Sequence, residues 1–352
     1  MIQQPQSICI IRISSMGDIV LASPLFRILR TAFPKARIDV VVAERFVELV
    51  ENNPHISNVI ALRTDEGITG ILQQSREARK SLTSHNYDIV LDLHVNIRSW
   101  FFRQLLGKKT YLVDKFRKQK KDLVERKLGL GRHFSTISER YIHTAPSLGI
   151  ENDKKGLELW LPEEKKLDYY PPERRKSPKG IIPQRIAIAP GARHFTKRWL
   201  PNRFAEVAME LSKKYGAEIV LLGGIDDQFQ CDEVKNLMTI PVIDATGLGS
   251  IIDTVRILDT CDLIICNDSG IMHIAAARQI PVCAIFGSTV REFGFAPFRV
   301  RNTVVEANVE CRPCTHIGLA KCPQGHFKCM NLVTVENILQ SIERDIIPVQ
   351  SL

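Results

Sequence analysis

The sequence lacks a long hydrophobic run, since no apolar stretch approaches the ~20 residues that a membrane-spanning helix needs. Its first residues, MIQQPQSICIIRISS, pass directly into a strand pattern, without the basic and then apolar segments of a signal peptide. It also lacks G-x-G-x-x-G and P-loop motifs, so neither a dinucleotide dehydrogenase nor a P-loop kinase is supported. We therefore expect a cytoplasmic protein of ordinary globular composition, 44% hydrophobic and 25% charged.

Positive charge is concentrated in one segment. The net charge is +9, and residues 98–133 hold twelve Lys and Arg against three acids, whereas the remainder has 36 residues of each sign. The segment is either a solvated helical face or a docking site for nucleic acid, phospholipid headgroups or a phosphorylated glycolipid. Its aromatic residues are not regularly interleaved with the basic ones, which argues against nucleic acid.

Short apolar runs alternate with helical patterns in two halves of the chain. A length of 352 residues suits about two domains with sizeable cores. Continuous apolar runs favour parallel strands covered on both faces, hence an α/β protein. The pattern predicts strands at 7–13, 37–42, 58–62, 88–93, 185–189, 218–222, 242–244, 263–266 and 282–286. Between the halves, the Pro- and Lys-rich stretch 163–184 has no periodicity and indicates an interdomain linker.

Small or polar loops follow the strands of the second half. Because the carboxyl ends of parallel strands meet at one edge of a sheet, these loops predict a ligand site there. Residues 268–270 begin a helix, where free N–H groups and the helix dipole favour a phosphate. Repetition of such loops favours a nucleotide site over ordinary helix capping. The loops are PGA (190–192), GGIDD (223–227), TGLG (246–249), NDSG (267–270) and GST (287–289).

Two further loops follow strands of the first half. The loop 14–18 presents Asp18 at a helix start, where it is either an N-cap or a general base aimed into a cleft. The loop 94–98 presents His94, Asn96 and Arg98 as candidates for binding an acceptor, and Arg98 suits a carboxylate or phosphate. Arg98 could equally belong to the solvated basic face.

A cysteine cluster lies near the end of the sequence. Cys311, Cys314, Cys322 and Cys329 form C-x2-C-x7-C-x6-C, with two histidines interleaved. The set is compatible with a structural zinc site or with reduced, buried thiols. Disulfides are not expected in a reducing cytosol.

Four segments carry a resemblance to a known family: 11–34 (IRISSMGDIVLASPLFRILRTAFP), 188–208 (IAPGARHFTKRWLPNRFAEVA), 266–289 (CNDSGIMHIAAARQIPVCAIFGST) and 311–330 (CRPCTHIGLAKCPQGHFKCM). The chain resembles the lipopolysaccharide heptosyltransferases of glycosyltransferase family 9, in particular the heptosyltransferase II-like members. This resemblance implies a GT-B fold, in which two Rossmann-like domains with parallel sheets face a central cleft. The implied domains are 1–165 on the acceptor side, a linker 166–184, a nucleotide-sugar domain 185–332, and a C-terminal helix 333–352 that packs back on the N-terminal domain.

The resemblance also implies an activity. Family members transfer heptose from ADP-L-glycero-D-manno-heptose to the inner core of a lipid A-linked acceptor, with inversion. Asp18 matches their general base, and Lys197 matches a lysine that meets the diphosphate. The remaining implied site residues are Asp226, Gly249, Asp268, Ser269, Gly270 and His273 for the donor, and Ser15, Gly17, His94, Asn96 and Arg98 for the acceptor.

The implied reaction needs no cofactor, because Lys197 and the helix start at 268–270 can hold the diphosphate; a structural zinc at the four cysteines stays open. The expected partners are the donor, the glycolipid acceptor and the cytoplasmic face of the inner membrane, contacted peripherally through residues 98–133. Two alternatives stay open. One is a family 9-like transferase that uses another nucleotide sugar or acceptor. The other is a nucleic-acid-binding protein that uses the basic segment and the cysteine tail.

Overall fold

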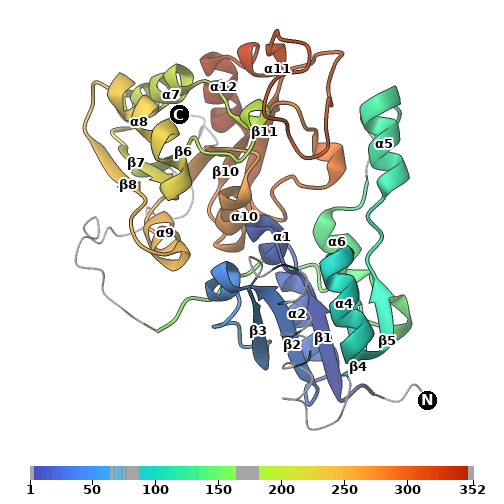
Figure 1. The fold of residues 1–352 in the computed structure, drawn as a ribbon. Coiled ribbons are helices and arrows are strands. Elements are labelled where there is room, and N and C mark those ends of the chain that lie inside the picture. Colours follow the sequence, from blue (N-terminus) through green and yellow to red (C-terminus); the bar gives the residue numbers. More distant parts are fainter. Residues whose placement is uncertain are drawn as a thin grey trace. The chain divides into compact units, whose positions relative to one another are not determined.

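The structure is a computed structural model that describes residues 4–63, 87–132, 134–163 and 182–347, together with positions 67, 70, 73 and 76. Contacts divide the chain into two compact units: Met1–Lys115 with Ile137–Glu163, and Phe116–Thr136 with Glu164–Leu352. Each unit contains one sheet whose described strand pairs are all parallel, with helices between the strands (Figure 1). The α/β fold with two parallel sheets is therefore confirmed. Most of the predicted linker, residues 166–181, lies outside the described residues.

The first unit is built on a five-stranded sheet in the order β3-β2-β1-β4-β5. Its three central strands are almost completely buried, as their continuous apolar sequences require. The strands are β1 (Ser7–Ile11), β2 (Arg37–Ala43), β3 (Asn58–Leu62), β4 (Tyr87–Asp92) and β5 (Gly107–Leu112).

The helical pattern at 19–32 forms two helices, α1 (Met16–Val20) and α2 (Ser23–Ala32). Pro24 lies in the first turn of α2 and has no N–H to continue an α-helical ladder from α1, so the chain turns at Leu21 and Ala22. The other helices of this unit are α4 (Ile97–Leu106), α6 (Ile137–Ile142) and the 3-10 helices η1 (Glu44–Leu49) and η2 (Pro146–Leu148).

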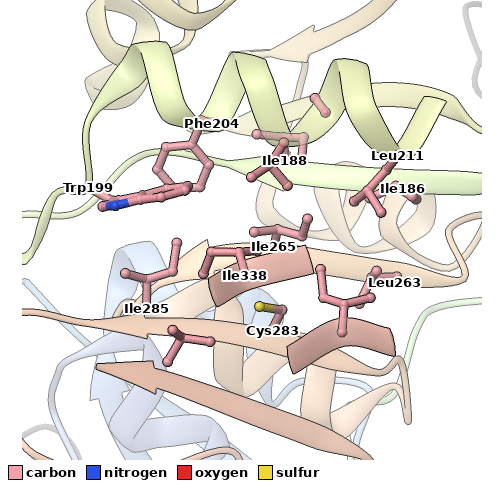
Figure 2. Packing of buried hydrophobic residues seen from close by; sticks show 14 of the residues in the cluster. Ile186, Ile188, Trp199, Phe204, Leu211, Leu263, Ile265, Cys283, Ile285 and Ile338 are labelled. Carbon is pink, nitrogen blue, oxygen red and sulfur yellow. The ribbon is translucent and has the colours of Figure 1, made fainter. Parts of the chain in front are cut away.

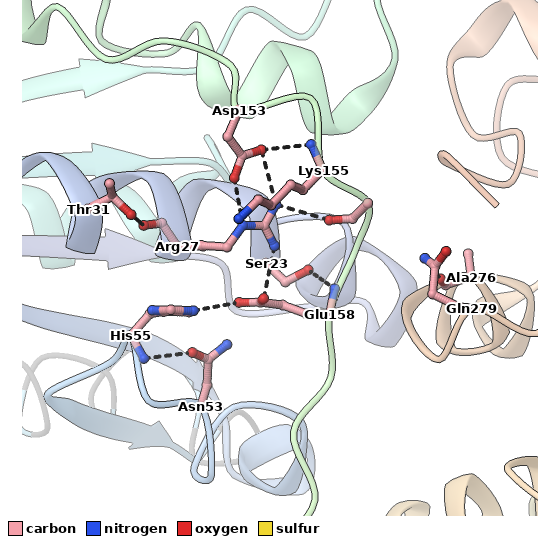
Figure 3. Close-up of polar contacts among 11 residues, drawn as sticks. Ser23, Arg27, Thr31, Asn53, His55, Asp153, Lys155, Glu158, Ala276 and Gln279 are labelled. Carbon is pink, nitrogen blue, oxygen red and sulfur yellow. Dashed lines mark hydrogen bonds and ion pairs between the residues drawn. The ribbon is translucent and has the colours of Figure 1, made fainter.

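A buried arginine ties the returning segment 153–158 to α2. Arg27 pairs through Nε with Asp153 at 2.7 Å and through Nη1 with Glu158 at 2.9 Å (Figure 3). Glu158 Oε1 also lies 3.2 Å from His55 Nε2, and the backbone N–H of Glu158 donates to Ser23 Oγ. These contacts fix residues 153–158 to the first unit.

The second unit is built on a six-stranded sheet in the order β11-β10-β9-β6-β7-β8. Its strands are β6 (Arg185–Ala189), β7 (Glu218–Gly223), β8 (Val242–Thr246), β9 (Leu263–Asn267), β10 (Val282–Phe286) and β11 (Asn302–Glu306). Its helices are α5 (Arg117–Arg126), α7 (Pro201–Tyr215), α8 (Gln228–Leu237), α9 (Ile251–Leu258), α10 (Gly270–Ala277), α11 (Lys328–Asn331), α12 (Val335–Asp345), η3 (Phe195–Lys197), η4 (Ile225–Asp227) and η5 (Arg291–Phe293).

Helices α7 and α12 cover one face of this sheet and complete its core (Figure 2). Phe204 and Leu211 of α7 and Ile338 of α12 are fully buried there. Each such side chain contributes roughly 1.5–3 kcal/mol relative to an exposed one. Within the second unit, α12 packs against α7 and β11. The expected packing of the C-terminal helix on the N-terminal domain stays a prediction.

Helix α5 also groups with the second unit, although the sequence assigned residues 1–165 to one domain. Leu123 of α5 packs with Val290 and Phe293 in a small buried cluster. Lys127, which follows α5, donates to the carbonyls of Cys311 (3.0 Å) and Pro313 (2.6 Å). The basic segment 98–133 is therefore divided between the two units.

Candidate active site

In the first unit, Asp18 lies in α1, directly after the loop that follows β1. Its Oδ2 atom pairs with Arg12 Nη2 at 2.6 Å and accepts from Ser15 Oγ at 2.8 Å and Ser15 N at 3.3 Å. Its Oδ1 atom accepts from the Tyr141 hydroxyl at 3.2 Å. Ser15 therefore orients the carboxylate, while Gly17 is buried beside it in the first turn of α1.

The surroundings of Asp18 keep it ionised. Burial favours the neutral acid, but the charge of Arg12 and the hydrogen bonds from Ser15 and Arg12 outweigh burial and lower the pKa of Asp18 to about 2. The side chain keeps 18% of its exposure, so one edge of the carboxylate can meet a substrate. Asp18 is not the N-cap of α1: Ser15 is the N-cap, and Asp18 is the third helical residue. The Asp18 carboxylate pairs with the buried Arg12 in addition to accepting from Ser15.

Arg12 and Tyr141 are site residues that the sequence analysis missed. A signal for Arg12 was present, because it stands between Ile11 and Ile13 at the end of a buried strand. A charge at such a position needs a partner of opposite charge. Tyr141 comes from α6, more than a hundred residues away in sequence, and no local pattern points to it.

The acceptor candidates of loop 94–98 differ in their surroundings. His94 is half-buried, and desolvation together with the charges of Arg12 and Lys115 lowers its pKa to about 4, so its ring is neutral at pH 7. Asn96 caps α4, since its Oδ1 accepts from Ser99 N at 2.9 Å and its own N–H donates to Ser99 Oγ at 3.0 Å. Arg98 is half-buried in the first turn of α4. The charges of Arg12 and Asp18 both act on His94, so His94 belongs to the surroundings of Asp18. Asn96 instead caps the start of α4.

In the second unit, the centre of the candidate site is an ion pair at the carboxyl end of β9. Lys197 Nζ lies 2.7 Å from Asp268 Oδ2, which also accepts from Thr289 Oγ1 at 2.7 Å. Lys197 ends η3, Asp268 follows β9 and Thr289 belongs to the GST loop after β10. Two of the loops predicted to meet at one sheet edge, NDSG and GST, therefore do meet, and Lys197 joins them from η3.

The helix start next to this pair retains unused hydrogen-bonding capacity. Ser269 is the N-cap of α10, and its Oγ is buried without a hydrogen-bond partner among the described residues. Gly270 begins α10, and His273 is buried one turn later, its ring centroid 6.4 Å from that of Phe295. A helix N-terminus with an adjacent lysine can hold an anion such as a phosphate.

A network beneath the site holds these loops. Asn267 Nδ2 donates to Pro190 O at 2.7 Å, and its Oδ1 accepts from Trp199 N at 3.0 Å. Arg312 of the cysteine tail donates to the carbonyls of Gly287 (2.5 Å) and Thr289 (2.7 Å). The tail therefore supports the GST loop, a role that its spacing did not predict.

The two remaining donor candidates, Asp226 and Gly249, differ in their surroundings. Asp226 is exposed, whereas its neighbour Asp227 lies so close to Gly191 that a Cβ there would meet its carboxylate at 2.2 Å. Gly249 has φ +71°, and a Cβ there would meet Asp253 Oδ2 at 2.1 Å. Asp253 caps α9, so Gly249 is required by its own loop, and its backbone alone could contact a ligand.

The four cysteines lie near one another without forming a ligand set. Burial raises the pKa of Cys314, with further contributions from Cys311 and Cys322, and burial raises the pKa of Cys329 to about 11. Cys311 Sγ lies 3.9 Å from His326 Nε2. In the part of the chain that the structure describes, no group of three or more His, Cys, Asp or Glu is arranged to hold a metal ion.

No described helix is both long and apolar enough to cross a bilayer.

Comparison with curated proteins gives relatives along most of the chain. The lipooligosaccharide heptosyltransferase 2 of Campylobacter jejuni serotype O:2 is 26% identical over 336 residues, 92% of this chain and 93% of the relative. Its counterpart from serotype O:6 is 31% identical over 204 residues, 56% of this chain and 60% of the relative.

Two solved structures share the fold. A glycosyl transferase family 9 protein of Veillonella parvula has a TM-score of 0.74 at 22% identity, with 96% of each chain covered. The heptosyltransferase WaaC of Escherichia coli, solved with ADP, has a TM-score of 0.68 at 19% identity, covering 96% of this chain and 99% of that one. These likenesses confirm the predicted GT-B type of fold.

The family profile for glycosyltransferase family 9 (heptosyltransferase) matches residues 75–322, more than half of the chain. The match includes the Lys197–Asp268 pair and the GST loop of the second unit. The chain belongs to glycosyltransferase family 9, the heptosyltransferases.

Proposed function

We propose that this glycosyltransferase transfers heptose from ADP-L-glycero-D-manno-heptose to the inner core of lipopolysaccharide, with inversion at the anomeric carbon. The observation that carries the proposal is the environment of Asp18, a carboxylate held ionised at the carboxyl edge of a parallel sheet. Its Oδ2 atom is saturated by Arg12 and Ser15, whereas Oδ1 accepts only from Tyr141 among the described residues. Oδ1 is therefore the oxygen that can take a proton.

The proposed step is a single displacement. The acceptor hydroxyl attacks the anomeric carbon, its proton passes to Asp18 Oδ1, and the bond from the anomeric carbon to the β-phosphate oxygen breaks. ADP leaves with an additional negative charge, which Lys197 and the N–H groups at the start of α10 stabilise. Ser269 and Gly270 supply those N–H groups.

The donor assignment draws on the family. The WaaC structure was solved with ADP, and this chain has a fixed lysine beside a helix N-terminus, a suitable seat for a diphosphate. Another nucleotide sugar or another acceptor within the same fold is the second candidate, because Asp226 and Gly249 alone do not select a sugar.

The experiment is a transfer assay with the wild type and Asp18→Asn, using ADP-heptose with a lipid A-Kdo acceptor and its monoheptosylated form. We expect the variant to bind ADP like the wild type and to lose transfer by about 10²–10⁴-fold, the usual effect of a general base. Asp114→Asn, which alters an exposed carboxylate of the same unit, is the matched control and should retain transfer. No wild-type transfer to either acceptor, with ADP still bound, would move the function to another sugar or acceptor.

The proposal includes transfer without a metal ion, because Lys197 and the helix start supply positive charge at the diphosphate. We expect the transfer rate to be unchanged after dialysis against EDTA. Elemental analysis of the purified protein tests separately for zinc at Cys311, Cys314, Cys322 and Cys329. A rate that falls with EDTA and recovers with Mg²⁺ would contradict a metal-independent step.

We also propose a cytoplasmic enzyme that acts at the inner-membrane surface, where its anionic glycolipid acceptor lies. Support comes from the exposed basic side chains of α5. A polybasic surface gains roughly 1 kcal/mol per Lys or Arg near anionic lipid.

A further inference from the structure

We propose that Arg12 is a positioning residue for the transfer reaction: it holds the Asp18 carboxylate in one orientation, with Oδ1 left for the acceptor hydroxyl, and keeps it charged beside an anionic acceptor. This inference rests on the proposed role of Asp18 as base and deepens it. Arg12 itself contacts neither donor nor acceptor in this scheme, because it acts through Asp18.

The geometry around Arg12 leaves its guanidinium little freedom. Its backbone N–H donates to Val41 O at 3.0 Å, which continues the β1–β2 ladder by one residue. Nη1 donates to Leu93 O at 2.6 Å, directly after β4, and the guanidinium carbon lies 5.6 Å from the centre of the Tyr141 ring. Only 10% of the side chain is exposed. Strands on both sides and α6 thus fix the direction of Nη2.

The direction of Nη2 determines which oxygen of the Asp18 carboxylate can still accept a proton from the acceptor. Nη2 contacts Oδ2 at 2.6 Å, the same oxygen that accepts both Ser15 bonds. Oδ1 has the Tyr141 hydroxyl as its described partner and retains capacity for a second donor. A lysine at position 12 could supply the charge but not the fork that joins Leu93 O to Asp18, because an ammonium is a point charge on a flexible stem.

The charge of Arg12 also opposes protonation of the Asp18 carboxylate. An acceptor that carries carboxylates or phosphates would stabilise the protonated form of a nearby carboxylic acid, which cannot accept a proton. A buried cation in contact with Asp18 opposes this effect. The charged and titratable groups that interact with this pair from the surrounding elements are Asp92, His94 and Tyr141. Lys115 in turn acts on His94, and Arg140 acts on Tyr141.

The test is the pH dependence of kcat/KM for the acceptor at saturating donor, for the wild type, Arg12→Met and Arg12→Lys. The wild-type profile should show no acid limb from Asp18 above about pH 3. Loss of Arg12 removes a charge that lowers an adjacent Asp pKa by about 1–3 units, so Arg12→Met should show an acid limb displaced upward to between about pH 3 and pH 5, with a rate at pH 4 up to about tenfold below that at pH 7. Arg12→Lys should keep the wild-type limb but lower kcat about tenfold or more without a matching rise in KM, because misorientation in the reacting complex costs rate.

Arg27→Met is the matched control, since Arg27 is also a buried arginine of the first unit but pairs with Asp153 and Glu158. It should lower thermal stability without moving the acid limb. Arg12→Met also removes a charge that lowers the pKa of His94. The wild type and Arg12→Met are therefore compared again with His94→Gln added to each, and the upward displacement of the acid limb should persist.

The outcomes are distinguishable. An Arg12→Met profile parallel to the wild type overturns the inference, as does wild-type kcat in Arg12→Lys. The kcat of Arg12→Lys decides the question even if Arg12→Met fails to fold. Transfer that survives in Asp18→Asn rejects the base assignment itself, whereas an inactive Asp18→Asn with a parallel Arg12→Met profile rejects only the role of Arg12.

Discussion

Lys197 shows how a loop lysine is fixed in place by its neighbours. Asp268 fixes its ammonium at 2.7 Å, and Thr289 binds the same carboxylate oxygen, so both groups are oriented by their neighbours. Its side chain is 17% exposed, which leaves a face open to a ligand. A cation fixed in this way loses little conformational freedom on binding an anion.

Replacing Lys197 by Met should therefore weaken ADP binding by about 10–100-fold, because hydrogen bonds between charged groups contribute about 1.5–3 kcal/mol. Isothermal titration calorimetry with ADP measures the effect. Lys213→Met, at an exposed position of α7 in the same unit, is the control and should bind like the wild type. Equal affinity in the two variants would remove Lys197 from the donor site.

The stability of the Arg12–Asp18 pair depends on pH in a definite direction. The folded-state pKa of Asp18 is about 2, below its ordinary value. Its contribution to the free energy of unfolding is therefore present above the unfolded-state pKa and is lost as pH falls toward about 2. Asp18 is protonated, and its ion pair with Arg12 is lost, only near pH 2. The Asp18 carboxylate therefore stays charged throughout the physiological range.

At the scale of elements, α5 combines anchored and exposed faces. Leu123 and the following Lys127 are fixed to the second unit, while Arg117, Lys118 and Lys121 are exposed. Lys120 differs from its neighbours because its Nζ lies 5.8 Å from the centre of the Phe295 ring. The exposed residues can therefore be changed without loss of the packing.

We expect Arg117, Lys118 and Lys121 changed together to Glu to release the enzyme from vesicles that contain anionic lipid, because three favourable contributions of roughly 1 kcal/mol each are reversed. Co-sedimentation with such vesicles at 0.15 M salt measures binding. The control makes the same charge change at Lys35, Lys154 and Lys213, which are exposed elsewhere. Vesicle binding that survives in the α5 variant would reject α5 as the membrane contact.

The elements that the sequence predicted are those with a continuous apolar pattern. Strands β1, β2, β3, β4, β6, β7, β8, β9 and β10 agree with the expected ranges within about two residues, a usual uncertainty for element ends. The strands that the sequence missed, β5 (GKKTYL) and β11 (NTVVE), lie at sheet edges, where exposure permits polar residues. The assignment of α5 was missed for a related reason, since its few contacts with residues near 290 and 312 involve distant parts of the chain.

The candidate site residues likewise divide into those with a local sequence signal and those that depend on contacts between distant parts of the chain. The sequence singled out Asp18, Lys197 and Asp268 because they lie after strand ends, in segments that resemble family motifs, and their roles stay predictions. Arg12 and Tyr141 act through tertiary contacts, and Asn96 and Gly249 proved to have tasks in their own loops. Proximity to a motif therefore predicts where a residue lies better than what it does.

For the whole molecule, the two units divide the proposed chemistry. The first contains the base and the second contains the cation and helix start for the diphosphate. A nucleic-acid-binding protein, the alternative of a different class, would use its basic segment for phosphate contacts. Within that segment, the Lys127 ammonium is already engaged, because it donates to the carbonyls of Cys311 and Pro313.

A thermal-shift experiment at 0.2 M salt separates these functions in the intact chain. A ligand that binds only the folded state at 100 times its Kd adds about 2.7 kcal/mol to the free energy of unfolding, so saturating ADP should raise the Tm by several °C. Duplex DNA of mixed sequence should leave the Tm unchanged at this salt concentration, where nonspecific phosphate contacts are weak. Lys197→Met should lose most of the ADP shift, whereas the triple Glu variant of α5 should retain it, because α5 is outside the donor site. Stabilisation by DNA without stabilisation by ADP would favour the nucleic-acid alternative, and an ADP shift retained by Lys197→Met would direct the search for the diphosphate site to another loop of the second unit.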